Sequence, residues 1–228
     1  MRIAAHLNGP PGAGQGGYVA GSLAVRLRGP GADVWLRAPA PLETDLREAG
    51  DDQHLELWDG SRLIAEADAV EVSVDPVPFV DLERARAAGR HYPGAASDLY
   101  AGCFGCGHAR PDGLRIGPGP VSEGLVACVY EPRGRVAPEW IWAALDCASG
   151  WAWPVHEIPL ATGRLTGGML EQEPLDPSGP YVVVAAQLER SGRRRISASA
   201  MFTAAGHRVA AVRGTWLTID TPPDHATG

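Results

Sequence analysis

A single aspartate interrupts the most apolar helical stretch of the chain. Residues 138–153, PEWIWAALDCASGWAW, carry Asp146 among alanine, leucine and tryptophan side chains. Burial of a carboxylate costs free energy and raises its pKa toward the range of a base that works near neutral pH. Asp146 is therefore a candidate general base or nucleophile. The alternative is a buried acid that only stabilises the fold through hydrogen bonds.

Four cysteines form a second group of residues that could do chemistry. Cys103 and Cys106 have the spacing of a zinc knuckle. A closed zinc site needs a second ligand pair, and Cys128 and Cys147 do not form one because they lie in an expected strand and an expected helix. We therefore expect free, reduced thiols and no bound metal, with Cys147 in a packing role.

Three consecutive arginines follow a turn at Ser191 and Gly192. Arg193, Arg194 and Arg195 could bind phosphate, because guanidinium groups match its geometry. A solvated hairpin end is the alternative. The sequence contains no P-loop, no dinucleotide-binding fingerprint and no Gly-X-Ser-X-Gly elbow. Its seven histidines form no metal-ligand or triad pattern, so the carboxylate remains the main catalytic candidate.

The elements expected around these residues occur twice along the chain. Each copy has a helical stretch, a strand-rich run and a final hairpin whose turn ends in glycine, at Gly60 and at Gly206. Pro138 and Glu139 suit the first turn of the second helix. The helices are expected over 16–27 and 138–153, the hairpins over 52–74 and 193–219, and the clearest buried strand over 180–188.

This repetition predicts two similar units joined by a linker. The N-terminal unit covers 1–76, the linker with a possible surface helix covers 77–102, and the C-terminal unit covers 103–222. Each unit is expected to contain a short first strand, one long buried helix and an antiparallel meander. The predicted fold class is α+β.

Composition excludes several kinds of function. The 228 residues include 20 basic ones, all arginine, so Schiff-base chemistry and a catalytic lysine are excluded. The net charge of −7 argues against nucleic acid as a partner. The sequence has no apolar run long enough to span a membrane and no apparent signal peptide, so we expect a cytoplasmic protein. The absence of lysine, with abundant alanine, glycine and arginine, suggests a bacterial gene of high GC content.

One buried helix against an antiparallel sheet, present twice in one chain, resembles the double hotdog fold. Gln15-Gly16-Gly17 resembles the His-Gly-Gly that opens the hotdog helix in phenylacetyl-CoA-type thioesterases, and Leu145-Asp146 resembles the Leu-Ala-Asp that carries their acidic catalytic residue. CFGCG followed by GLRI, over 103–116, resembles the segment before the first strand of many members. The resemblance implies two antiparallel sheets, each wrapped around a long central helix. It also implies acyl-CoA as substrate, no cofactor and a homo-oligomer.

The two expected helices have lost complementary groups. When Leu23 is aligned with Leu145, Gly16 falls opposite Pro138, which has no N–H, and Asp146 falls opposite an alanine at position 24. Eight residues of helix rise about 12 Å, so a glycine and an acid that far apart on one helix cannot serve one carbonyl. The resemblance therefore implies one composite site built from both halves.

In the expected composite site, backbone groups and side chains have different roles. Backbone N–H groups of Gly16 and Gly17 would stabilise the oxyanion, and Asp146 would act as base or nucleophile. Asn8, Gln15 and Trp142, together with the three arginines, are the candidate substrate contacts. The competing hypothesis is a non-catalytic hotdog protein that binds an acyl ligand or supports assembly.

Overall fold

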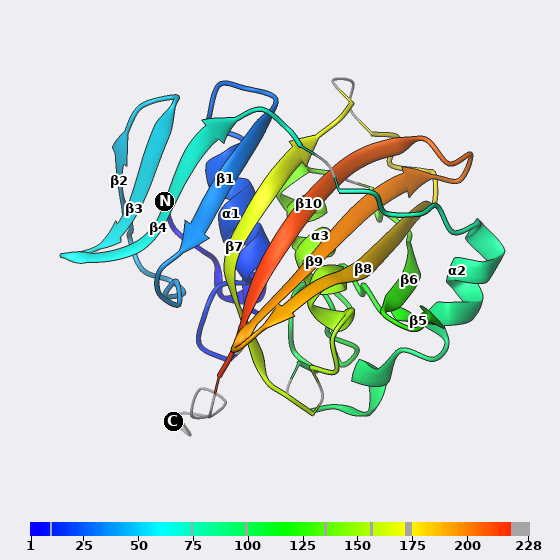
Figure 1. Ribbon diagram of the computed structural model, residues 1–228. Helices are drawn as coiled ribbons and strands as arrows, with labels where there is room; N and C mark the ends of the chain where they lie inside the picture. The colour runs from blue at the N-terminus through cyan, green and yellow to red at the C-terminus, as the bar shows by residue number, and fades with distance from the viewer. Residues whose placement is uncertain are drawn as a thin grey trace.

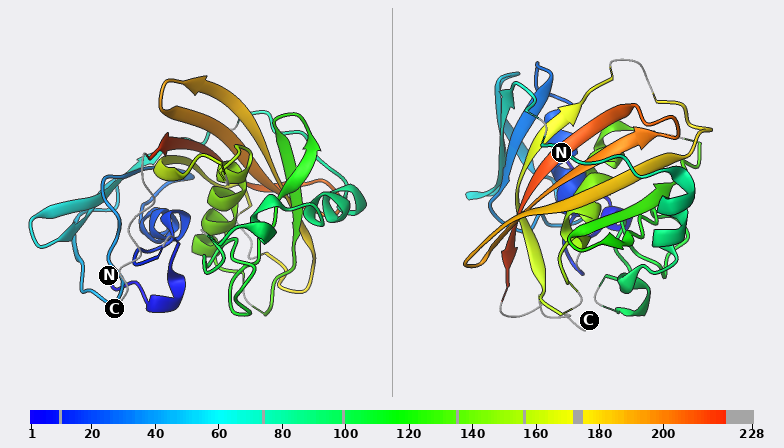
Figure 2. Two further views of the ribbon diagram at one scale, coloured as in Figure 1. Left: turned by 90° about the horizontal axis from the view of Figure 1, so that it is seen from below. Right: turned by 45° about the vertical axis from the view of Figure 1, so that its right-hand side comes forward.

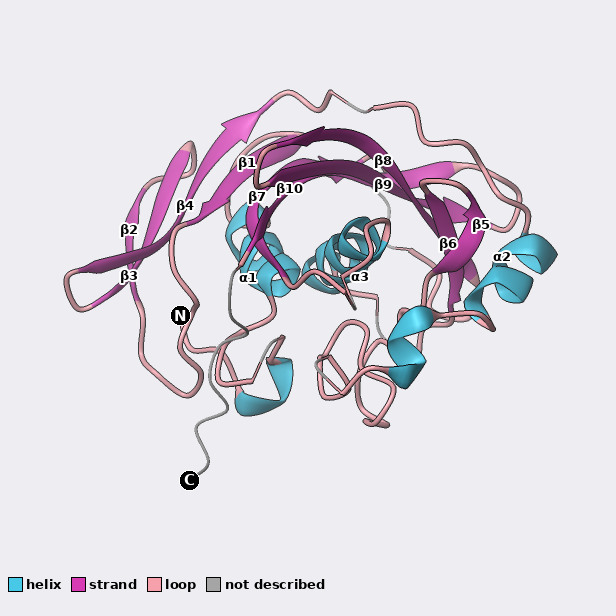
Figure 3. Cartoon of the chain, turned by 60° about the horizontal axis from the view of Figure 1, so that its bottom comes forward, coloured by secondary structure: helices cyan, strands magenta, loops and turns pink. Residues whose placement is uncertain are grey.

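The computed structural model shows an α+β molecule in which one large sheet arches over two helices (Figures 1 and 3). Figure 2 shows the same two helices side by side beneath the sheet. The structure describes residues 1–9, 11–73, 75–98, 100–134, 136–155, 157–171 and 175–219. The predicted C-terminal unit ends at residue 222, so its last three residues lie outside the described part.

Ten strands of the described chain form a single antiparallel sheet in the order β2-β3-β4-β1-β7-β10-β9-β8-β6-β5. The strands are β1 (Gly31–Leu36), β2 (Arg47–Gly50), β3 (His54–Asp59), β4 (Arg62–Val70), β5 (Gly119–Ser122), β6 (Leu125–Tyr130), β7 (Leu160–Met169), β8 (Tyr181–Ser191), β9 (Arg194–Thr203) and β10 (Arg208–Thr218).

The expectation of two separate sheets is wrong. Strands β1 and β7 pair directly, with Val34 opposite Leu165, and this pairing joins the strands of the N-terminal half (β1–β4) to those of the C-terminal half (β5–β10). Both residues are fully buried. Each half would otherwise expose an unpaired strand edge at this position.

The two central helices are α1 (Gly16–Ala24) and α3 (Pro138–Trp151). They run antiparallel, because Gly17 lies against Asp146 whereas Gly21 lies against Glu139. A methyl group on Gly17 would lie 2.4 Å from the Asp146 Cβ, so glycine permits this close approach. Helix α1 is shorter than predicted, because the chain turns after Ala24 to enter β1.

Both predicted hairpins are confirmed. Strands β3 and β4 join through a turn at Gly60, and β9 and β10 join through a turn at Gly206. These glycines have φ values of +57° and +88°, a region that L side chains adopt only with strain. The predicted buried strand over 180–188 is β8, where Val182, Val183 and Val184 are fully buried.

The halves differ before their central helices. In the C-terminal half, the β5–β6 hairpin precedes α3. In the N-terminal half, a 3₁₀ turn at Ala5–Leu7 and isolated bridges precede α1, so the described residues of 1–9 and 11–15 do not form the short first strand expected there. The glycine- and proline-rich sequence before α1 explains this difference, because these residues interrupt a ladder.

The segment between the halves crosses the outer face of the sheet before it forms α2 (Leu82–Gly89), which packs beside β5 and β6 (Figure 1). Asp81 caps this helix by accepting a hydrogen bond from the Arg84 N–H at 2.9 Å. Val77 and Val80 cover a second core on the outer face, against Phe202 and other residues of β6 and β8–β10.

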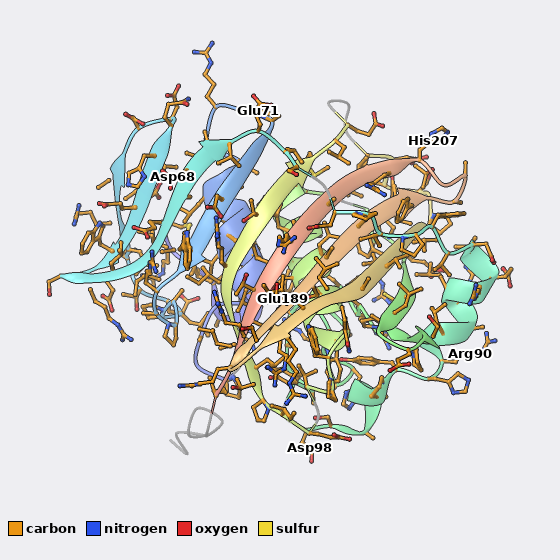
Figure 4. All side chains as sticks on the ribbon, in the orientation of Figure 1. Asp68, Glu71, Arg90, Asp98, Glu189 and His207 are labelled. Atoms are coloured by element: carbon orange, nitrogen blue, oxygen red, sulfur yellow. The ribbon has the colours of Figure 1, made fainter. Side chains whose placement is uncertain are left out.

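Ionisable side chains labelled in Figure 4, such as Asp68, Glu71 and His207, are exposed on the surface of the molecule. Within the described residues, none of the helices is both long enough and apolar enough to cross a membrane.

Candidate functional site

Asp146 lies at the contact between α1 and α3 and is only 2% exposed. Its Oδ2 accepts hydrogen bonds from the Gln15 Nε2 at 2.7 Å and from the Gly17 N–H at 2.9 Å. Its Oδ1 accepts one hydrogen bond, from the Thr162 hydroxyl on β7 at 3.0 Å. Three elements therefore fix this carboxylate, and residues from both halves of the chain contribute.

The environment of Asp146 opposes ionisation. Burial raises the pKa of the carboxyl to about 7, although hydrogen bonds from Thr162, Gly17 and Gln15 act in the opposite direction. A carboxylate oxygen has two lone-pair positions. Oδ2 uses both, whereas Oδ1 uses one, so within the described structure Oδ1 keeps capacity to accept a proton from a further donor.

Gln15 caps α1 and holds the acid at the same time. Its Oε1 accepts a hydrogen bond from the Tyr18 N–H at 2.6 Å, which satisfies an unpaired donor of the first helical turn. Its Nε2 donates to Asp146 and also lies 3.5 Å from the Cys147 sulfur. The amide is therefore placed to orient the acid.

The two glycines expected to donate to an oxyanion have different surroundings. The Gly17 N–H is directed to Asp146. The Gly16 N–H has no acceptor among the hydrogen bonds of the described residues, and Gly16 lines a cavity together with Asp146 and Thr162. Gly16 is thus the donor available to a ligand at the start of α1.

This cavity, here called the acid cavity, has a volume of about 290 Å³ and lies between the halves. Asp146, Gly16 and Thr162 line its polar part, whereas Trp151 and Leu160 line its apolar part. An apolar cavity with a few convergent polar groups is the usual form of a small-molecule site.

Of the six candidate substrate contacts predicted from the sequence, Gln15 lines the acid cavity and the other five are not among its described lining residues. Asn8 donates to the Gly102 carbonyl at 3.1 Å and accepts from Arg110 at 2.8 Å, so it ties the N-terminal loop to the loop before the second unit. Trp142 is buried on another face of α3 and lines a second cavity instead. Arg195 is buried, and its Nη1 donates to the Gly192 carbonyl at 2.8 Å.

The other two arginines lie at the sheet end near the acid cavity. Arg194 pairs with Leu217 on β10, and Leu217 lines the cavity. Arg193 donates to the Thr218 carbonyl at 2.8 Å. The Arg194 side chain is exposed at this end of the sheet.

The second cavity, here called the apolar cavity, lies at the opposite end of the helix contact. Ala24 and Pro138, the positions that the helix alignment placed opposite Asp146 and Gly16, both line it. None of its described lining residues has an ionisable side chain. Both losses read from the sequence thus fall in the apolar cavity, whereas the retained groups, Gly16 and Asp146, share the acid cavity.

Two features of the site were missed in the sequence. Thr162 carries no motif, and its contact with Asp146 depends on the register of β7. Cys147 was expected only to pack, yet its sulfur lies with those of Cys103 and Cys106 in one group whose members are all within 4.8 Å of one another. All three line the acid cavity.

The chain has the hotdog fold. Its structure is similar to the tesB protein of Mycobacterium avium subsp. paratuberculosis, with a TM-score of 0.58, 12% identity, and coverage of 93% of this chain and 90% of that one. It is also similar to acyl-CoA thioesterase II TesB2 of Mycobacterium marinum, with a TM-score of 0.53, 12% identity, and coverage of 92% and 90%.

A hot dog fold protein from Alicyclobacillus acidocaldarius gives a TM-score of 0.58 at 12% identity, over 96% of this chain and 92% of that one. No family model and no curated protein sequence matches the chain. At these identities the likeness establishes the fold, and the chemistry has to be argued from the site itself.

Proposed function

We propose that the protein is an acyl-CoA thioesterase that works at the acid cavity. The observation that carries this proposal is the convergence of a buried carboxylate and an available helix N–H on one apolar cavity between the halves. The structural similarity to a Mycobacterium marinum protein that is named as an acyl-CoA thioesterase supports it. In this proposal the apolar part of the cavity holds the acyl group.

The proposed reaction uses two polar groups of the acid cavity, the Gly16 N–H and the Asp146 carboxylate. The Gly16 N–H donates to the thioester carbonyl oxygen and stabilises the negative charge that develops there, with help from the α1 dipole. Oδ1 of Asp146 takes a proton from water as the water oxygen attacks the carbonyl carbon. The carbon–sulfur bond then breaks, and the CoA thiolate leaves and takes up the proton held by Asp146, which regenerates the carboxylate.

Gln15, Gly17 and Thr162 act as positioning residues in this scheme. Their hydrogen bonds fix the carboxylate so that Oδ1 keeps one direction for a proton donor. Asp146 can also attack the carbonyl directly, which would form an anhydride that water then opens. The two routes have the same products and differ in whether an oxygen atom of Asp146 is exchanged.

The first experiment measures release of free CoA from short, medium, long and aromatic acyl-CoAs. We expect Asp146→Asn to lower kcat/KM by about 10²–10⁴-fold, because a general base contributes rate factors of this size. Asn keeps the shape and one acceptor oxygen, so circular dichroism should show an intact fold. Asp33→Asn is the matched control, since Asp33 accepts hydrogen bonds from Arg164 and Thr166 outside the acid cavity.

Full activity of Asp146→Asn on every substrate that the native protein hydrolyses would refute catalysis by this acid and favour the acyl-binding hypothesis. A single turnover in ¹⁸O-labelled water separates the two catalytic routes. Mass spectrometry would find ¹⁸O in the peptide that contains Asp146 only if the carboxylate attacks the thioester.

A further inference from the structure

The acid cavity contains a second chemical group that thioester hydrolysis does not use. The sulfur atoms of Cys103, Cys106 and Cys147 all lie within 4.8 Å of one another, and those of Cys103 and Cys147 are 4.0 Å apart. All three residues are buried. Two come from the loop before β5 and one from α3, so the fold brings them together across more than 40 residues of sequence.

The loop at 103–107 is shaped to receive the third sulfur. A Cβ on Gly105 would lie only 2.4 Å from the Cys147 sulfur, so glycine leaves the space that this sulfur occupies. The loop is wound tightly, since the Gly107 N–H donates to the Cys103 carbonyl at 2.8 Å.

Further hydrogen bonds anchor the cluster from outside. The Phe104 N–H donates to the Asn8 carbonyl at 2.7 Å, and the Ile116 N–H donates to the Gly105 carbonyl at 2.8 Å. The Gln15 amide lies 3.5 Å from the Cys147 sulfur. Metal-binding thiolates commonly have such outer partners, which fix the orientation of the ligands.

The spacing of the three sulfurs suits a tetrahedral ion. With zinc–sulfur bonds of about 2.3 Å, sulfur ligands of a tetrahedral zinc lie about 3.8 Å apart. The cluster therefore needs to contract by about 1 Å or less along any pair to bind such an ion. Thiolate ligands select zinc and other soft ions over magnesium or calcium.

We propose that Cys103, Cys106 and Cys147 form a three-thiolate site for a zinc ion, with its fourth position left to water or to a ligand in the acid cavity. All three cysteines line this cavity, and sites with three protein ligands characteristically keep one position for an exchangeable group. Cys103 and Cys106 have the spacing of a zinc knuckle, but no bound metal was expected from the sequence, because Cys147 belongs to no recognisable ligand spacing. The proposal does not depend on thioesterase activity.

The test measures metal on the intact full-length protein. It is purified in reducing buffer without chelator, loaded with zinc and passed through a desalting column. Elemental analysis should then find about one zinc per chain. X-ray absorption at the zinc edge should show three sulfur neighbours at about 2.3 Å. Cobalt in place of zinc should give thiolate-to-metal absorption bands.

Cysteine variants locate the ion. Cys106→Ser and Cys147→Ser should each weaken zinc binding by more than about tenfold, since even loss of an outer partner costs 10–100-fold. Cys128→Ser is the matched control, because Cys128 is equally buried but lies on β6 outside the cluster. Gly105→Ala should weaken binding while all four thiols remain, because its methyl group would displace the Cys147 sulfur.

Three results would overturn the proposal. One is native protein that retains less than a tenth of an equivalent of zinc after loading. Another is an equal loss of zinc in Cys128→Ser. The last comes from a thiol titration of metal-free protein that is unfolded in the absence of reductant. If only two of the four cysteines react, a disulfide would explain the proximity of the sulfurs. The absorption spectrum of the native protein decides the matter even if a variant fails to fold.

Discussion

The two ends of the contact between α1 and α3 have cavities of nearly equal volume but different chemistry. The acid cavity measures about 290 Å³ and the apolar cavity about 280 Å³. Asp146 and Gly16 line the first, whereas Ala24 and Pro138 line the second. The packing of two helices under one sheet therefore forms a cavity at either end, and the side chains decide which cavity can do chemistry.

The close packing of α1 against α3 has a different consequence at each end of their contact. Near the acid cavity, Gly17 brings its N–H to the carboxylate, so close packing positions a reactive group. Four residues further along α1, Gly21 brings the helix against the backbone of Glu139, where close packing serves only stability. Adding a methyl group at Gly17 or at Gly21 therefore tests the positioning of Asp146 separately from the stability of the helix contact.

Gly17→Ala is expected to have the largest effect. Its methyl group would lie 2.4 Å from the Asp146 Cβ and 2.5 Å from the Trp142 carbonyl oxygen. The helices must move apart, at a cost of about 1–3 kcal/mol in the free energy of unfolding. Because misplacement by about 1 Å can cost 10²-fold in rate, thioesterase kcat/KM should fall by at least that factor.

Gly21→Ala is the control at the other end of the same helix, since its methyl group would lie 2.7 Å from the Glu139 Cα. It should cost a similar free energy of unfolding, about 1–3 kcal/mol, measured by urea denaturation, with a much smaller loss of activity. Equal losses of activity in the two variants would show that general stability, rather than the position of Asp146, explains the effect of Gly17→Ala.

Much of the fold could be predicted because its signals are local. The hairpins at Gly60 and Gly206 follow from turn chemistry, and α3 follows from Pro138 and the apolar run after it. The pairing of β1 with β7 has no local signal, since the strands are about 130 residues apart in the chain. One continuous sheet was therefore missed.

The candidate site could likewise be predicted only in part from the sequence. Asp146 stands out because it is a lone acid in an apolar helix, and Gly17 because it follows the start of the other helix. The contact of Thr162 with the acid depends on strand register, and the meeting of Cys147 with Cys103 depends on tertiary packing. The capping role of Gln15 had no clear sequence signal either, because glutamine is not among the residue types preferred at helix N-caps.

Thr162→Val tests whether the hydrogen bond from Thr162 orients the Asp146 carboxylate. It keeps the shape of the side chain but removes the hydrogen bond to Asp146 Oδ1, so the carboxylate becomes less well oriented and kcat should fall about tenfold, a loss typical of a small misplacement. Thr166→Val on the same strand is the control, because its hydroxyl donates at 2.7 Å to Asp33 instead. Steady-state kinetics that show equal kcat for both variants would argue against orientation by Thr162.

A smaller effect is expected at the sheet end beside the acid cavity. If Arg194 meets the phosphates of CoA, Arg194→Gln should raise KM by up to about fivefold and leave kcat nearly unchanged, because an exposed charge pair contributes up to about 1 kcal/mol. The rise in KM should shrink in high salt. Arg90→Gln, at the exposed C-terminal end of α2 (Figure 4), should leave KM unchanged.

The smallest effect is expected at the apolar cavity, where Ala24→Asp restores the missing acid. Ala24 is the last residue of α1, and a negative charge there opposes the helix dipole at a cost of about 0.3–1 kcal/mol. The new carboxylate would face Pro138, which has no N–H to donate. We therefore expect no added thioesterase activity. The informative background is Asp146→Asn, in which any new hydrolysis must come from position 24. Activity regained in this double variant would show that an acid alone is sufficient in either cavity, and the helix N–H would then lose its place in the mechanism.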